Sequence, residues 1–168
     1  MKFIHTSDWQ IGKTYGRHST KSTFKITDIQ QKFIDFRFET VGKIVSHAKE
    51  NNVDFVLVAG DLFDRNYEDL LKININIVRK TIDLLNEFDP IKVFILPGNH
   101  DYYSENSIWE KTVWKENIKH HVKVFDEAET VFDLSKNGIQ VDLDTVIYPC
   151  PFFQQNPIGD LTEWIPNS

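Results

Sequence analysis

Cysteine is almost absent from this chain, because Cys150 is the only one among 168 residues. A single cysteine excludes an internal disulfide and any metal cage built from thiolates. Basic residues are also in deficit, since 19 Lys and Arg stand against 25 Asp and Glu and give a net charge of −6. A broad basic surface for gripping nucleic acid unaided is therefore not expected. A partner subunit could supply one, and bound divalent ions would add positive charge locally.

Long apolar runs are missing as well. The apolar start Met1–Thr6 gives way at once to Ser7-Asp8, so it has neither the apolar core nor the cleavage site of a signal peptide. No stretch has the length and apolar character of a membrane span. We therefore expect a cytoplasmic protein without membrane contact. A hydrophobic share of 40% over 168 residues predicts one globular domain, residues 1–168.

Short β-rich runs alternate with helical patterns along the first hundred residues. Strands are predicted at Lys2–Thr6, Asp54–Ala59 and Lys92–Leu96, with helices at Asp28–Glu50 and Glu68–Glu87 between them. This alternation predicts the α/β class, with a mainly parallel sheet flanked by helices. Further elements are predicted as a short helix near Ser107–Lys115 and strands near Val122–Phe125, Thr130–Leu134 and Val146–Tyr148.

The first predicted helix carries apolar residues at helical spacing. We expect its core face to consist of Ile29, Phe33, Phe36, Ile44 and Ala48. Thr27, with Gln30 three positions on, predicts a capping box at its start.

Polar side chains follow each of the three predicted strands. Asp8 follows the first, Asp61 the second and Asn99-His100-Asp101 the third, and a glycine precedes both Asp61 and Asn99. The carboxyl ends of parallel strands meet at one edge of a sheet, so these side chains are expected to converge there. Oxygen donors of this kind suit Mn²⁺ or Mg²⁺, and one carboxylate can bridge two ions. Asp61, on the middle element, is the candidate bridge.

These residues also form a recognisable pattern. Asp8, Gly60-Asp61-Leu62-Phe63-Asp64 and Gly98-Asn99-His100-Asp101 resemble the D-x-H, G-D-x-x-D and G-N-H-D motifs of calcineurin-like metallophosphoesterases. Within that superfamily, His5-Thr6-Ser7-Asp8-Trp9 followed by Ile11-Gly12-Lys13 is similar to the opening of SbcD-type nuclease subunits. The resemblance implies a metallophosphoesterase sandwich.

The resemblance also implies a role for each matching residue. Asp8 and Gln10 would bind the first metal ion, Asp61 would bridge, and Asn99 would bind the second. His100 would protonate the leaving oxygen or steady the phosphate, Asp64 would orient His100, and Arg65 would contact phosphate. The alternative readings are a helix-cap carboxylate for Asp64 and a solvated surface side chain for Arg65.

The sequence departs from the family pattern in two places. Gln10 stands where the family has a histidine, and a carboxamide oxygen is a weaker ligand than imidazole for Mn²⁺ or Fe²⁺. The family takes three further histidines from later segments, whereas the last histidine here is His121. We therefore expect about half of a metal site and a sandwich incomplete in its C-terminal half. A fragment, a missing half on a separate polypeptide and a non-catalytic relative all remain open.

The function implied by the resemblance is Mn²⁺-dependent hydrolysis of DNA phosphodiester bonds, as an exonuclease or endonuclease in double-strand-break repair and recombination. It implies two divalent metal ions, with Mg and Fe as alternatives to Mn, a homodimer, and an SbcC-like SMC-type ATPase as partner. Arg17 and Lys21, in the basic loop Lys13–Lys25, are candidates for contact with the DNA backbone. The alternatives are a phosphatase or phosphodiesterase for another substrate, and a binding module that no longer cleaves.

Overall fold

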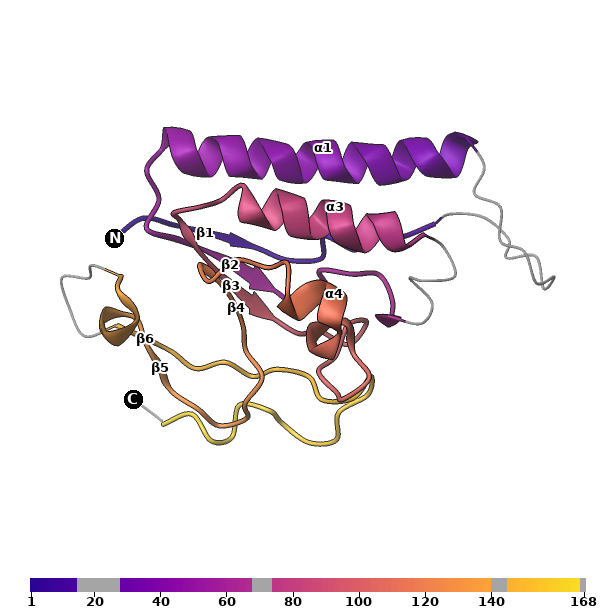
Figure 1. The fold of residues 1–168 in the computed structure, drawn as a ribbon. Coiled ribbons are helices and arrows are strands. Elements are labelled where there is room, and N and C mark those ends of the chain that lie inside the picture. Colours follow the sequence, from indigo (N-terminus) through magenta and orange to yellow (C-terminus); the bar gives the residue numbers. More distant parts are fainter. Residues whose placement is uncertain (15–27, 68–73, 140–144, 167–168) are drawn as a thin grey trace.

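The computed structural model describes residues 1–14, 28–67, 74–139 and 145–166. Its centre is a parallel sheet with the strand order β1-β2-β3-β4 (Figure 1). The strands are β1 (Phe3–Thr6), β2 (Phe55–Ala59), β3 (Lys92–Leu96) and β4 (Val122–Val124). The α/β class and the parallel sheet are confirmed, and the strands begin within one residue of the predicted positions.

Two long helices cover one face of this sheet (Figure 1). Helix α1 spans Asp28–Glu50, as predicted, and α3 spans Ile75–Asn86. The Asn74 side chain caps α3 by accepting a hydrogen bond from the backbone N–H of Asn76 at 2.9 Å. Asparagine is a strong cap because its side chain satisfies a backbone donor that the helix cannot. This cap fixes the start of α3 inside the range predicted from Glu68, and 68–73 lie outside the described residues.

The predicted core face of α1 is wrong at its first three positions. Ile29, Phe36 and Phe33 are 68%, 62% and 45% exposed. The helix packs on the sheet instead through the series Ile34, Phe38, Val41, Val45 and Ala48. Apolar residues lie on more than one side of α1, so periodicity alone could not decide which side faces the sheet.

The segment after β3 turns beneath the sheet edge. A 3₁₀ turn, η1 (Ile108–Glu110), and a short helix, α4 (Thr112–Lys115), replace the single helix predicted near this position. Lys111 separates them because its backbone is extended, with φ −80° and ψ 144°. The last described strands, β5 (Phe132–Asp133) and β6 (Val146–Ile147), pair antiparallel below the sheet, and η2 (Ser135–Asn137) lies between them (Figure 1).

The sheet separates two apolar cores. Successive side chains of a strand point to opposite faces, so Val56 packs toward the helices while its neighbour Phe55 packs toward β5. The second core is largely aromatic and includes Phe94, Phe125 and Phe132. Both faces of β2 and β3 are therefore covered, and the polar loops at their carboxyl ends rest on a fixed base. None of the described helices is both long and apolar enough to cross a membrane.

Candidate active site

The segments that follow β1 and β2 continue side by side past the ends of the strands. The backbone N–H of Asp8 donates to the carbonyl of Gly60 at 3.1 Å, and that of Gln10 donates to the carbonyl of Asp61 at 2.9 Å. A bridge between Ile11 and Phe63 extends the contact. The predicted convergence of Asp8, Gln10 and Asp61 at one sheet edge is therefore present.

Three of the predicted ligands share an unusual backbone conformation. Asp8, Gln10 and Asp61 have φ values of 54°, 43° and 53°. Residues other than glycine rarely adopt positive φ, and each instance costs on the order of 1 kcal/mol. Such strain persists where the surrounding structure imposes it, and it gathers at functional sites. Here it lies at the residues that the sequence motifs single out.

The loop after β3 lies directly against Asp61. The buried Asp61 carboxylate accepts a hydrogen bond from the backbone N–H of His100 at 3.0 Å. A Cβ atom on Gly98 would lie 2.5 Å from the Asp61 backbone nitrogen and 2.9 Å from its carboxyl carbon. Glycine is therefore required at position 98 by close approach. Asn99, half-buried, lies between these two contacts and so beside Asp61.

Asp101 braces the two loops from below, a role that the sequence motif did not reveal. It is only 3% exposed, and its two carboxylate oxygens accept hydrogen bonds from the backbone N–H groups of Gly98 at 2.8 Å and Phe63 at 3.0 Å. Its carbonyl accepts a third from the Trp109 indole at 2.6 Å. Burial raises the pKa of Asp101 to about 6, although the two backbone donors oppose this shift.

His100 contacts Asp64, but through a different group than predicted. Its Nδ1 lies 2.7 Å from the backbone carbonyl oxygen of Asp64. A carbonyl only accepts, so a proton on Nδ1 satisfies this contact and leaves Nε2 to act on a substrate. The expected contact with the carboxylate is not formed, because that carboxylate lies 2.8 Å from the Arg65 guanidinium and 3.5 Å from the Lys13 ammonium.

Arg65 is half-buried beside His100. Its Nη2 donates to Asp64 at 2.8 Å and approaches the Thr14 hydroxyl at 3.4 Å. Its Nε is buried and has no hydrogen-bond partner among the described residues. Buried polar donors are nearly always satisfied, so an open guanidinium donor here indicates a place for an anion.

The first metal position is occupied by an internal cation. Lys13 Nζ donates to the Gln10 side-chain oxygen, the atom predicted to bind metal. Asp8 is exposed, and one of its carboxylate oxygens accepts from the Ser7 hydroxyl at 2.8 Å. This part of the site therefore attracts positive charge, but its donors are engaged elsewhere. Arg17 and Lys21 lie outside the described residues.

The donor set fits hard divalent ions only in part. Asp8, Gln10, Asp61 and Asn99 offer carboxylate and carboxamide oxygens, which suit Mg²⁺ and Mn²⁺. Across the four described ranges, however, no three His, Cys, Asp or Glu side chains gather closely enough to hold a metal ion. Further ligands are needed to complete either position.

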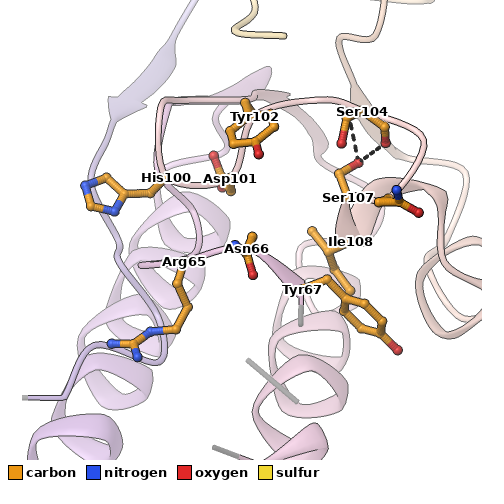
Figure 2. A pocket seen from close by; sticks show the side chains of 10 residues that line it. Arg65, Asn66, Tyr67, His100, Asp101, Tyr102, Ser104, Ser107 and Ile108 are labelled. Atoms are coloured by element: carbon orange, nitrogen blue, oxygen red, sulfur yellow. Dashed lines mark hydrogen bonds between the residues drawn. The ribbon is translucent and has the colours of Figure 1, made fainter. Parts of the chain in front are cut away.

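A pocket of about 200 Å³ opens beside His100 and Arg65 (Figure 2). Tyr102 and Tyr67 lie on opposite sides of it, with Ile108 between them. The wall near Ser107 is held by that residue's hydroxyl, which donates to the carbonyl of Ser104 at 2.7 Å.

Comparison with known proteins agrees with this geometry. The sequence profile of the calcineurin-like phosphoesterase family matches residues 1–160. The SbcD subunit of the nuclease SbcCD from Staphylococcus epidermidis is 28% identical over 141 residues, which cover 83% of this chain and 33% of that protein. The SbcD subunit from Staphylococcus saprophyticus is 32% identical over 101 residues, which cover 60% of this chain and 23% of that protein.

The chain thus spans at most about a third of the length of these curated relatives. The family match implies divalent metal ions and phosphoester hydrolysis. A match over residues 1–160, carried by the loops described above, shows that this chain belongs to the calcineurin-like phosphoesterase family.

Proposed function

We propose that this chain provides part of a DNA nuclease of the SbcD type, which hydrolyses phosphodiester bonds during the processing of double-strand breaks. The observation that carries the proposal is the contact between the Asp61 carboxylate and the His100 backbone N–H at 3.0 Å. It places the candidate bridging ligand beside the candidate general acid. The relatives are named as subunits of the nuclease SbcCD, and this name supports DNA as the substrate.

In this proposal the oxygen donors Asp8, Gln10, Asp61 and Asn99 hold two divalent ions, with Mn²⁺ ahead of Mg²⁺ and Fe²⁺. Bound ions of this kind activate water and stabilise the charge that develops on phosphorus oxygens. Two positions with four such donors are under-supplied, so we propose that histidines from further polypeptide complete them.

The chain's own groups then act on the phosphate. His100, with Nδ1 at the Asp64 carbonyl, presents Nε2 to the leaving 3′ oxygen and gives it a proton. Arg65 directs its open Nε toward a phosphate oxygen and offsets its charge. Asp64 holds Arg65 in place through its carboxylate at 2.8 Å, so it positions both groups.

The partners follow from the same comparison. We propose that the protein works as a homodimer with an SbcC-like SMC-type ATPase, as the name of the relatives suggests. A net charge of −6 favours such an arrangement, because a partner would supply the basic surface that DNA binding requires. Arg17 and Lys21 remain candidates for backbone contact, and a cytoplasmic location is part of the proposal.

The test is Mn²⁺-dependent cleavage of end-labelled single- and double-stranded DNA by the purified chain. His100→Ala is compared with His47→Ala, a variant of an exposed histidine on α1. We expect cleavage that His100→Ala reduces about 100-fold or more, as for loss of a general acid, and that His47→Ala retains. Cleavage at equal rates by both variants would refute the role of His100. No cleavage by any of them would favour a binding module or a chain that needs its missing ligands in trans.

A phosphomonoesterase is the second candidate, and the open Nε of Arg65 favours it. A terminal phosphate carries more charge than a diester and gains more from a guanidinium. Rates on p-nitrophenyl phosphate and bis-p-nitrophenyl phosphate separate the two. Faster hydrolysis of the monoester, lost in Arg65→Gln, would replace the nuclease proposal.

A further inference from the structure

The pocket beside His100 and Arg65 is not used by the residues proposed for catalysis. It lies between the segment that follows β2 and the loop that leads into η1. In Figure 2, Tyr102 and Tyr67 face each other across it. A substrate phosphate held by His100 and Arg65 would therefore place its attached group at the pocket entrance.

The lining combines aromatic surface with neutral hydrogen-bonding groups. Tyr67 and Tyr102 are half-buried and offer ring faces and hydroxyls, while Ile108, 2% exposed, gives an apolar floor. Asn66 and Asn106 add carboxamides, each with a donor and an acceptor. Rings for stacking with neutral donors and acceptors at the edge are what a nucleobase requires.

The distribution of charge points the same way. Among the described residues that line the pocket, Asp101 is the only carboxylate, and its oxygens are turned to the backbone N–H groups of Gly98 and Phe63. The cationic group Arg65 lies at one side, next to His100. Lys111 Nζ lies 5.6 Å from the centre of the Tyr67 ring and leaves this aromatic wall electropositive. An anion is thus favoured at the Arg65 side and a neutral group in the interior.

We propose that this pocket binds the nucleoside attached to the scissile phosphate, with its base between Tyr67 and Tyr102 and its edge at Asn66 and Asn106. The proposal rests on the proposed nuclease function and specifies its substrate. A base in this pocket is out of its stack and unpaired, and unstacking is least costly in single strands and at frayed ends. The site therefore acts on unpaired nucleotides.

Binding of small ligands tests this without catalysis. Calorimetry in the presence of Mn²⁺ compares thymidine 5′-monophosphate, inorganic phosphate and thymidine. We expect the nucleotide to bind about tenfold more tightly than phosphate, as one stacked base contributes. Equal affinities for nucleotide and phosphate, or no binding of either, would overturn the proposal.

Variants then locate the nucleoside. Tyr102→Leu and Asn106→Ala remove a ring face and a carboxamide, and Asn76→Ala on the exposed side of α3 is the matched control. We expect the nucleotide's advantage over phosphate to fall at least threefold in Tyr102→Leu and less in Asn106→Ala, with Asn76→Ala like the parent. Thermal melting confirms that each variant is folded. An unchanged advantage in both pocket variants would overturn the proposal.

Cleavage of DNA separates this inference from the proposed function. DNA cleavage without any preference for nucleotide over phosphate would leave the nuclease standing and remove the pocket's role. Selective nucleotide binding without DNA cleavage would leave the pocket standing and remove the nuclease.

Discussion

The two ends of the parallel sheet use their polar residues in different ways. At the carboxyl end, Asp8 and Asp61 have left-handed backbones, and Arg65 keeps a buried donor without a partner among the described residues. At the amino end, polar groups pair with near neighbours across adjacent strands and loops. Asp54, for example, accepts from the Lys2 backbone N–H at 2.6 Å and donates its own N–H to the Lys2 carbonyl at 2.8 Å.

The amino end also holds ordinary surface pairs. Lys119 Nζ lies 3.1 Å from the Asp89 carboxylate, and this hydrogen bond lowers the pKa of Asp89. His121, at the start of β4, lies 3.1 Å from the carbonyl of Leu85 at the end of α3. These contacts join elements of one fold and leave little for a ligand. One sheet can therefore hold a stability end and a site end, and substitutions should separate them.

The largest expected effect is that of Gly98→Ala at the site end. Its Cβ would lie 2.5 Å from the Asp61 backbone nitrogen, so either the loop or the Asp61 carboxylate must move. We expect a loss of stability of about 3 kcal/mol or more, as for severe overpacking. Urea unfolding measures it.

Gly42→Ala on α1 is the matched control, because nothing lies within 4 Å of its added Cβ. Alanine inside a helix should stabilise the chain by about 0.5–1 kcal/mol. A Gly98→Ala protein as stable as Gly42→Ala would mean that the two loops do not pack as described.

Asp101→Ala should give the next largest effect. It leaves the buried N–H groups of Gly98 and Phe63 without their acceptor, at about 1–3 kcal/mol for each unsatisfied group. We expect the protein to lose about 2–4 kcal/mol of stability and to bind Mn²⁺ more weakly, because both ligand loops are released. Chemical unfolding and a Mn²⁺ titration measure the two results.

The control for Asp101→Ala is Asp83→Ala, an exposed carboxylate on α3. It should change neither quantity much. A loss of stability in Asp101→Ala with full Mn²⁺ affinity would show that the brace serves the fold alone and would weaken the distinction between the two ends.

Gln10→His addresses the less complete part of the site. An imidazole is a stronger ligand than a carboxamide oxygen for Mn²⁺, and it cannot accept the Lys13 proton through the same oxygen. We expect Mn²⁺ affinity to rise about tenfold, which corresponds to about 1.4 kcal/mol. An unchanged titration would rule out Gln10 as a metal position. Lys13→Met, which frees the Gln10 oxygen without adding a ligand, should raise the affinity less.

Much of the fold could be predicted from the sequence because its signals are local. The range Asp28–Glu50 and the three main strands followed from periodicity and length, and the converging loops followed from the parallel order of the strands. The side of α1 that faces the sheet could not be predicted, since Phe36 and Phe38 are both apolar and only packing against β-strands chooses Phe38.

The site was predictable in position but less so in contacts. The motifs located Asp61 and His100 correctly at one edge. They could not show that Lys13 and Arg65 attract the Asp64 carboxylate away from His100, because this depends on charges brought together by folding. The brace at Asp101 was hidden for a similar reason, since a buried carboxylate and a metal ligand look alike in a sequence.

The smallest predicted effect belongs to the amino end, where His121 is 2% exposed. Burial lowers its pKa from 6.5, although the Leu85 carbonyl and Asp89 act in the opposite direction, while Lys119 and His120 add to the lowering. Because the unfolded chain binds this proton more readily than the folded one, the neutral ring's contribution to stability is present above pH 6.5 and is lost as the pH falls through that value. Melting temperatures between pH 5 and pH 8, roughly the range in which histidine titrates, should therefore fall on the acid side. The fall should be smaller in His121→Gln than in the exposed variant His47→Gln. Equal pH profiles in the two variants would show that His121 does not couple protonation to folding, and a Mn²⁺ affinity that changed in His121→Gln would join the two ends of the sheet that the other substitutions are expected to separate.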